Sequence, residues 1–90
     1  MQIDDIKVLK HDDRGTIYRC ESINYIVRHK GTISADHTHG EKETLYLVEG
    51  SVELTIGTET KNISAPAKVF IPSNKYHKLI ALTDIKLIRA

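Results

Sequence analysis

The sequence predicts an all-β protein, built as an antiparallel barrel or sandwich of short strands. Apolar and polar residues alternate over residues 52–56, which is the period of a half-buried strand. Short segments rich in β-branched, aromatic and aliphatic residues recur along the chain, most of them separated by glycines, and no segment has a sustained helical period. Many short strands at this spacing favour a barrel or sandwich. Ninety residues suit one domain, so we expect a single domain over residues 1–90.

The expected strands follow one another with short breaks. They cover residues 16–20, 25–28, 44–49, 52–56, 60–63, 68–71, 78–82 and 85–88. Pro66 and Pro72 flank one of them, at the strand ends where proline is tolerated. Segment 44–48 is apolar on both faces, which predicts that a second layer, including a partner subunit, covers it. The alternative is a half-exposed Tyr46, and both interpretations stay open.

Composition limits the kinds of partner. The formal net charge is +1, with acids and bases interspersed and no basic stripe, so we expect no nucleic-acid partner. No stretch approaches the length of a membrane span, and the N-terminal residues lack the apolar run of a signal peptide. We therefore expect a cytoplasmic protein with no membrane association. Cys20 is the single cysteine, which excludes an internal disulfide, and we expect it to be a small buried hydrophobe.

Three histidines and one glutamate form the pattern with the clearest chemistry. His37 and His39 share a face of an extended strand, and Glu43 keeps the same parity if the chain stays extended. His77 lies far along the sequence, where a barrel could bring it beside the first two. Glu41 has the same parity as Glu43 and is a competing carboxylate. Imidazoles suit Zn, Cu, Fe and Ni, and a carboxylate adds affinity for Mn, so the set predicts one divalent transition metal with open coordination positions.

The spacing of these residues resembles a known signature. Gly31, His37, His39, Glu43 and Gly50 match the first motif of the cupin superfamily without a gap.

The second cupin motif, Pro-x-Gly-x-x-His, resembles residues 72–77 and ends at His77. Asn74 stands in the glycine place, which is a mild change because asparagine tolerates a left-handed turn. Pro66 and Ala81 stand where the family has a glycine and an asparagine.

This resemblance covers about residues 31–82. It implies a jelly-roll barrel, or double-stranded β-helix, of six to eight strands with both motifs lining the interior. It also implies that His37, His39, Glu43 and His77 ligate one Zn, Ni, Fe, Mn or Cu ion. Glu41 is then a loop residue near the mouth. Cupins commonly pair, so the resemblance implies a homodimer.

The fold leaves several functions open. A small metalloenzyme of the oxygenase or isomerase type would act on a small molecule, with Tyr76, Glu41 and Lys75 as candidate substrate-binding or acid–base groups near the mouth. A non-catalytic protein that binds or senses a small ligand or the metal is the first alternative. The second is a metal-free nucleotide-sugar epimerase or isomerase, because residues 12–16 resemble the Asp-x-Arg-Gly stretch of those cupins. A polar turn ending at Gly15 is the interpretation that we favour for that stretch.

Overall fold

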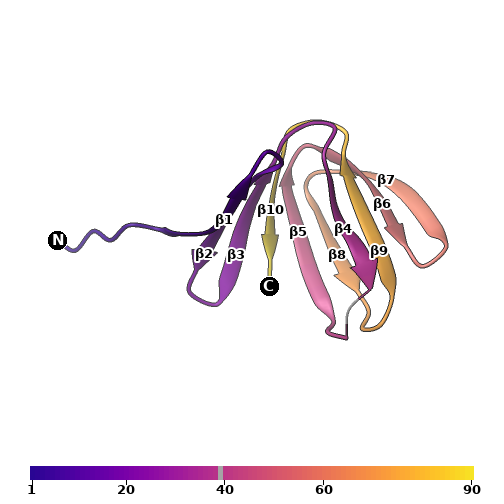
Figure 1. Ribbon diagram of the computed structural model, residues 1–90, viewed down its shortest axis with the longest axis horizontal. Helices are drawn as coiled ribbons and strands as arrows, with labels where there is room; N and C mark the ends of the chain where they lie inside the picture. Colours follow the sequence, from indigo (N-terminus) through magenta and orange to yellow (C-terminus); the bar gives the residue numbers. More distant parts are fainter. Residues whose placement is uncertain (39) are drawn as a thin grey trace.

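The structure, a computed structural model, describes residues 1–38 and 40–90 and consists of short strands (Figure 1). The strands are β1 (Lys7–Asp12), β2 (Gly15–Cys20), β3 (Ile23–Arg28), β4 (Ile33–Thr38), β5 (Glu43–Glu49), β6 (Ser51–Ile56), β7 (Glu59–Ser64), β8 (Ala67–Ile71), β9 (Tyr76–Ala81) and β10 (Ile85–Arg89). Among the described residues, no helix has the length and apolar character needed to cross a membrane.

Two antiparallel sheets make up the fold. The larger has the strand order β1-β2-β3-β10-β5-β8, and the smaller has the order β4-β9-β6-β7. The β1–β2, β2–β3 and β6–β7 hairpins connect neighbours in one sheet, whereas every other connection from β3 to β10 passes from one sheet to the other. The predicted all-β, antiparallel jelly-roll architecture is therefore confirmed.

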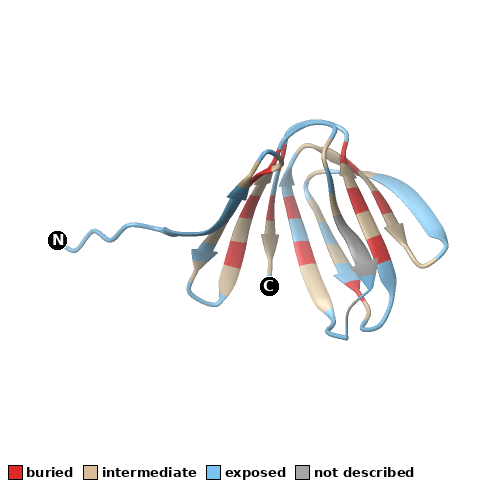
Figure 2. Ribbon diagram, in the orientation of Figure 1, coloured by how far each residue is buried: buried red, intermediate tan, exposed pale blue. Residues whose placement is uncertain are grey.

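The core lies between the sheets, on the inward-facing half of each strand. Figure 2 shows buried positions alternating with exposed or partly exposed ones, as period-two side-chain geometry requires. The buried apolar residues are Ile17, Ile26, Leu45, Leu47, Val52, Leu54, Ile71, Leu79, Ala81, Ile85 and Leu87. Each large aliphatic side chain buried in this way contributes about 1.5–3 kcal/mol, so a small core still supplies substantial stability.

Every strand expected from the sequence is present, with ends shifted by at most two residues. The expected count of six to eight strands was too low, because the described residues form ten. β1 and β4 are the additional strands. β1 is almost wholly exposed and carries no buried apolar face that would mark it in the sequence. It forms because it pairs along β2, and β4 similarly pairs with β9, so tertiary context determines both.

Within one chain, β5 is buried on one face alone. Leu45 and Leu47 point into the core, whereas Tyr46 and Val48 are exposed on the outer face of the larger sheet. The Lys68 ammonium lies 5.6 Å from the centre of the Tyr46 ring. Tyr46 is thus half exposed in the single chain, and cover by a partner subunit remains a prediction.

Candidate metal centre and adjoining cavity

Two of the predicted ligand positions lie opposite each other in the smaller sheet. Strands β4 and β9 are antiparallel, and His37 is the register partner of His77. Directly opposed residues in such a ladder have Cα atoms about 4.5–5.5 Å apart. The register shifts by one residue between Ser34 and His37, which marks a bulge in β4. The prediction that a barrel brings these distant segments together holds at the level of the backbone.

His77 points inward and is almost completely buried. It is 1% exposed, and it shares the inward face of β9 with Leu79 and Ala81. Its Nδ1 lies 3.1 Å from the carbonyl oxygen of Lys75. A carbonyl oxygen accepts hydrogen bonds and cannot donate one, so Nδ1 carries a proton and donates it; in the neutral ring, Nε2 is then the nitrogen with the lone pair. Histidines that ligate metals are commonly oriented in this way by a backbone carbonyl.

The turn before β9 sets this geometry. Asn74 has φ of +60°, the left-handed conformation that the second motif normally assigns to glycine. The expectation that asparagine can replace glycine at this position is confirmed. The turn reverses the chain after β8 and places Lys75 where its carbonyl group meets the His77 ring.

Glu43 begins β5 in the larger sheet. It has the same parity as the buried Leu45 and Leu47, so it faces the interior. There it lines a cavity between the two sheets, called the main cavity below. Figure 1 shows the end of β4 and the starts of β5 and β9 gathered at the lower end of the molecule. The fold therefore brings Glu43 and His77, from opposite sheets, to the same end of the barrel.

The other half of the expected ligand set is not described. His39 lies outside the described residues, and so does the side chain of His37. Among residues whose side chains are described, no group of three or more His, Cys, Asp and Glu converges. The assignment of four ligands therefore stays a prediction, with Glu43 and His77 as its described members.

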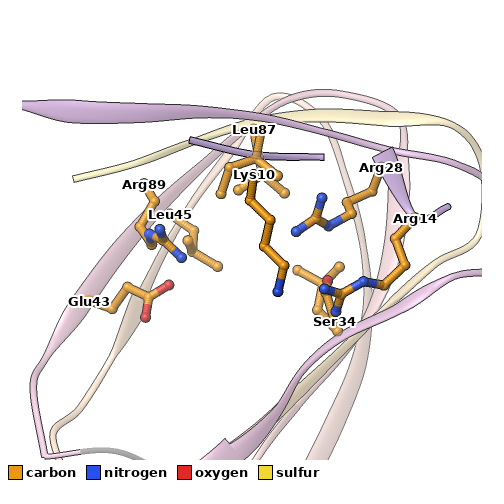
Figure 3. Close-up of a pocket in the computed structure, with 10 residues that line it drawn as sticks. Lys10, Arg14, Arg28, Ser34, Glu43, Leu45, Leu87 and Arg89 are labelled. Carbon is orange, nitrogen blue, oxygen red and sulfur yellow. The ribbon is translucent and has the colours of Figure 1, made fainter. Parts of the chain in front are cut away.

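The main cavity lies between the sheets and has a volume of about 430 Å³. Its described lining residues are Lys10, Arg14, Ile26, Arg28, Ser34, Glu43, Leu45, Leu79, Leu87 and Arg89. Figure 3 shows Glu43 and Arg89 at one end, Arg14, Arg28 and Ser34 at the other, and Lys10 reaching between them. The walls are aliphatic in part, but four of the lining side chains are cationic and one is a carboxylate.

Arg28 is the buried member of this set. It is 5% exposed, and burial, followed by the nearby charge of Arg14, lowers the pKa of its guanidinium below the ordinary value of 12.5. Arg89 adds to this repulsion, whereas Asp12 opposes it. Low dielectric surroundings and like charges both disfavour the protonated form, although arginine stays charged at physiological pH.

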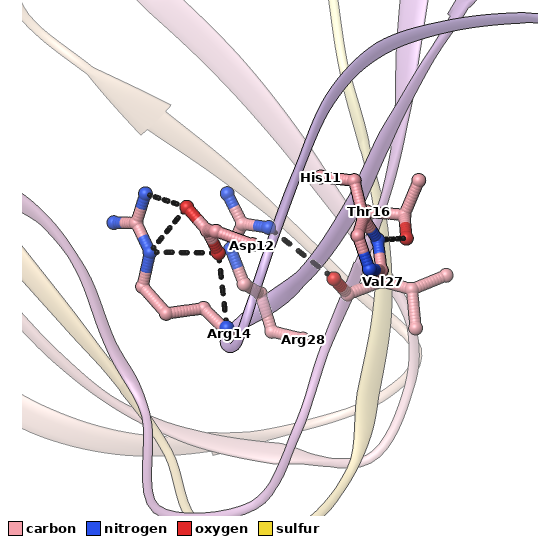
Figure 4. Close-up of polar contacts among 6 residues, drawn as sticks. All are labelled: His11, Asp12, Arg14, Thr16, Val27 and Arg28. Atoms are coloured by element: carbon pink, nitrogen blue, oxygen red, sulfur yellow. Dashed lines mark hydrogen bonds and ion pairs between the residues drawn. The ribbon is translucent and has the colours of Figure 1, made fainter.

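Arg14 sits in the turn between β1 and β2. Its Nη2 donates to Asp12 Oδ2 at 2.8 Å, and its backbone N–H donates to Asp12 Oδ1 at 2.9 Å (Figure 4). The hydrogen bonds from the Arg14 side chain hold the pKa of the Asp12 carboxyl well below its ordinary value. The interpretation of residues 12–16 as a polar turn is confirmed, and the turn also delivers Arg14 to the cavity.

The predicted substrate-binding residues Glu41 and Tyr76 lie outside the main cavity. Glu41 is exposed and lines an adjoining depression of about 590 Å³, which shares Glu43 and Arg89 with the main cavity. Tyr76 is 37% exposed and alternates with His77, so it faces away from the interior. Lys75 is exposed in the turn before β9. Among the described residues, neither Glu41 nor Tyr76 lines the main cavity.

The cationic lining was not predicted, although the sequence carries a signal for it. Arg28 is two residues after Ile26, and Arg89 is two after Leu87, so each arginine continues the inward-facing row of its strand. A charged residue at a core-facing parity is unusual enough to mark a candidate site. Lys10 has no such signal, because β1 has no apolar row with which to compare it.

Comparison with known proteins adds the family and the fold. Residues 24–88 match the family model described as the cupin domain. No curated protein matches the sequence. A crystal structure of an RmlC-like cupin from Shewanella frigidimarina is similar, with a TM-score of 0.81 and 19% identity, over 93% of this chain and 80% of the other.

Two longer proteins contain similar domains. CapF of Staphylococcus aureus has a TM-score of 0.79 at 18% identity, over 97% of this chain and 28% of CapF. Salicylate 1,2-dioxygenase of Pseudoaminobacter salicylatoxidans has a TM-score of 0.70 at 19% identity, over 81% of this chain and 20% of the enzyme. The chain thus spans less than a third of each. At these identities, the similarity shows the fold.

Proposed function

The chain belongs to the cupin family, and on that premise we propose that it binds one divalent transition metal through His37, His39, Glu43 and His77. Three imidazoles and one carboxylate suit Zn, Ni, Fe, Mn or Cu. Four protein ligands leave one or two positions on a five- or six-coordinate ion, as in sites that bind substrate.

The observation that carries this proposal is the setting of His77. A histidine that is 1% exposed inside a barrel, with Nδ1 donating to the Lys75 carbonyl, has Nε2 as its ligating atom when the ring is neutral. The register partner of His77 is another residue of the ligand motif, His37, and Glu43 faces the interior at the same end. This donor chemistry fits the metal that the motif implies.

We further propose that the protein is a small metalloenzyme acting on a small molecule in the adjoining cavity. A bound metal would supply Lewis-acid or redox chemistry at the Glu43 end. The chain itself supplies a cavity of about 430 Å³, large enough for a small ligand, with walls that are part aliphatic and part charged. Related structures include salicylate 1,2-dioxygenase in complex with gentisate and CapF with an inhibitor, which are small-molecule complexes of proteins with this fold.

Calorimetric titration of Zn²⁺ into the chelator-treated chain tests the metal assignment. We expect about one site per chain, and we expect His77→Ala to weaken Zn²⁺ binding by at least about 100-fold, because loss of one ligand costs more than loss of its outer-shell support. His29→Ala is the matched control, since His29 is an exposed histidine outside both motifs. Equal Zn²⁺ affinity in the two variants would refute the assignment.

We also propose that the chain forms a homodimer through the outer face of the larger sheet. Tyr46, Val48 and Phe70 are 39%, 52% and 55% exposed there. Tyr46 and Val48 are two residues apart on β5 and therefore share its outer face, and Phe70 is on the adjacent strand β8. Large apolar side chains exposed on one face favour association, and a two-fold pair would cover them with its own copy.

A further inference from the structure

We infer that the Arg14 and Arg28 end of the main cavity is a subsite for an oxyanion, a carboxylate or phosphate group, on the small molecule that the protein binds. The rest of that molecule would extend past Lys10 toward Glu43. The inference rests on the proposed function only in taking this cavity as the ligand site, because the anion contacts themselves require no metal.

The first support is the incomplete pairing of Arg28. Its side chain is 5% exposed and lines the cavity, yet within the described part of the chain its Nε has no hydrogen-bond partner. Its Nη1 donates to the neighbouring Val27 carbonyl at 3.4 Å, near the limit for a hydrogen bond. Buried charges in proteins are normally paired, because an unpaired charge loses its hydration without compensation. A guanidinium left in this state is suited to an anion that arrives with the ligand.

The second support is the charge around Arg28. Arg14, Arg89 and Lys10 also line the cavity, and Glu43 is the one carboxylate among its described lining residues. Glu43 lies at the opposite end from Arg28 (Figure 3). The Arg28 end therefore has an excess of positive charge that a low-dielectric wall would focus on a bound anion.

Among the described acids, Asp12 offsets this positive charge only in part. Asp12 is committed to Arg14, which binds it through both its side chain and its backbone N–H (Figure 4). The pair also holds Arg14 in place, because Asp12 ends β1 and Arg14 lies in the short turn that joins β1 to β2. Asp12 thus pairs with Arg14, and within the described part of the chain the Nε of Arg28 keeps no hydrogen-bond partner.

The shape of the groups favours an oxyanion. The planar guanidinium binds carboxylate or phosphate through two parallel N–H bonds. The Ser34 hydroxyl lies at the same end and can donate a further hydrogen bond. Leu45, Leu79 and Leu87 also line the cavity, which suits a short carbon skeleton attached to the anion.

Calorimetry with succinate is the direct experiment, performed on the full chain after chelation and again after Zn²⁺ loading. Succinamide is the probe of matched size without charge, and methyl phosphate distinguishes a phosphate ligand from a carboxylate. We expect succinate or methyl phosphate to bind at least about tenfold more tightly than succinamide, as charge-assisted hydrogen bonds require. The tighter of the two anions identifies the group. Equal affinity for succinate, methyl phosphate and succinamide would overturn the inference.

Substitution of Arg28 assigns the effect to this residue. Arg28→Met should weaken binding of the preferred anion by at least about tenfold, and Arg28→Lys should bind with intermediate affinity, because it keeps the charge and loses the fork. Lys86→Met is the matched control, since it removes one positive charge from the outer face of the same sheet. Anion binding that is unchanged in Arg28→Met, or lowered equally by Lys86→Met, would contradict the subsite.

Folding is monitored separately by thermal unfolding. Without ligand, Arg28→Met should have an unchanged or higher melting temperature, because it replaces an incompletely paired buried charge by an apolar chain. A melting temperature lowered in Arg28→Met and restored in Arg28→Lys would show that Arg28 is a structural charge, and would refute the inference. Failure of Zn²⁺ binding with anion binding intact would count against the proposed metal alone, whereas the reverse result would count against the subsite alone.

Discussion

Two interior positions of this barrel hold polar residues that are suited to binding, although apolar residues there would stabilise the core more. His77 and Arg28 occupy inward-facing positions that aliphatic side chains hold elsewhere on the same strands. Polar groups at these positions reduce the apolar surface that the core buries. A protein of 90 residues already buries a small fraction of its surface. Such positions are expected at functional sites, since activity and stability are frequently opposed.

Asp12 provides a residue-scale prediction with a defined pH dependence. Hydrogen bonds from Arg14 lower the pKa of Asp12 below its ordinary 3.8 in the folded state. The charged carboxylate therefore stabilises the fold above pH 3.8, and this contribution is lost as the pH falls below that value. Asp12→Asn should lower the free energy of unfolding at about pH 7, and the difference should shrink at about pH 3.

Urea unfolding of both proteins at the two pH values measures this difference. Asp13→Asn is the control, because Asp13 is exposed in the same turn and its side chain makes no hydrogen bond with the described residues. A difference between wild type and Asp12→Asn that stays constant with pH would show that the carboxylate charge is not the source.

Part of the site follows from sequence at this scale. The left-handed conformation of Asn74 and the inward direction of His77 were both predictable from motif position and strand parity. The hydrogen bond of His77 to Lys75 was not, because a backbone carbonyl leaves no signature in the sequence. Arg28 could have been found by parity, but its burial depends on how closely β2 approaches β3, which is a tertiary property.

At the scale of the strands, the way in which each strand is paired explains which strands could be predicted from the sequence. Strands with a buried apolar row, such as β6, follow from alternation. β1 has no buried position and exists through its hairpin with β2, so no local pattern could reveal it. β4 contains a bulge that disturbs its alternation between Ser34 and His37.

Gly15 tests how closely these strands are packed. It has φ of +138°, and an added Cβ would collide with the carbonyl group of Val27 on β3. Gly31 also has a positive φ, +83°, but a Cβ there would meet nothing within 4 Å. Gly31→Ala should cost about 1–2 kcal/mol from backbone strain, and Gly15→Ala should cost about 1–3 kcal/mol more because of the collision.

Chemical denaturation of the two variants gives the comparison. Because both substitutions add one methyl group at a positive φ, the difference between them isolates packing from backbone strain. Equal destabilisation would contradict the close approach of β2 to β3 at this position.

At the scale of the whole molecule, the exposed apolar face predicts self-association. Val48→Lys places a charge in the proposed interface, and burying that charge in a dimer would be costly. We expect wild type to have twice the chain mass by light scattering at micromolar concentration and Val48→Lys to have the mass of one chain. The anion and metal sites should be unaffected, because Val48 points away from the interior.

Ile33→Lys is the matched control for this experiment. Ile33 is 47% exposed on β4, in the smaller sheet, so the substitution adds the same charge to the opposite side of the molecule. A monomeric wild type would end the dimer proposal. A dimer disrupted by Ile33→Lys but not by Val48→Lys would show that the interface is on the smaller sheet, against the proposal.

The metal assignment is the central claim, and anomalous X-ray scattering from a crystal of the Zn²⁺-loaded chain tests it most directly. Data collected above and below the zinc absorption edge locate the ion without assuming its ligands. We predict one strong peak per chain, about 2.0–2.2 Å from nitrogen atoms of His37, His39 and His77 and from a carboxylate oxygen of Glu43. A peak bound by other residues, such as the exposed His11 or His29, or no peak between the sheets, would contradict the account.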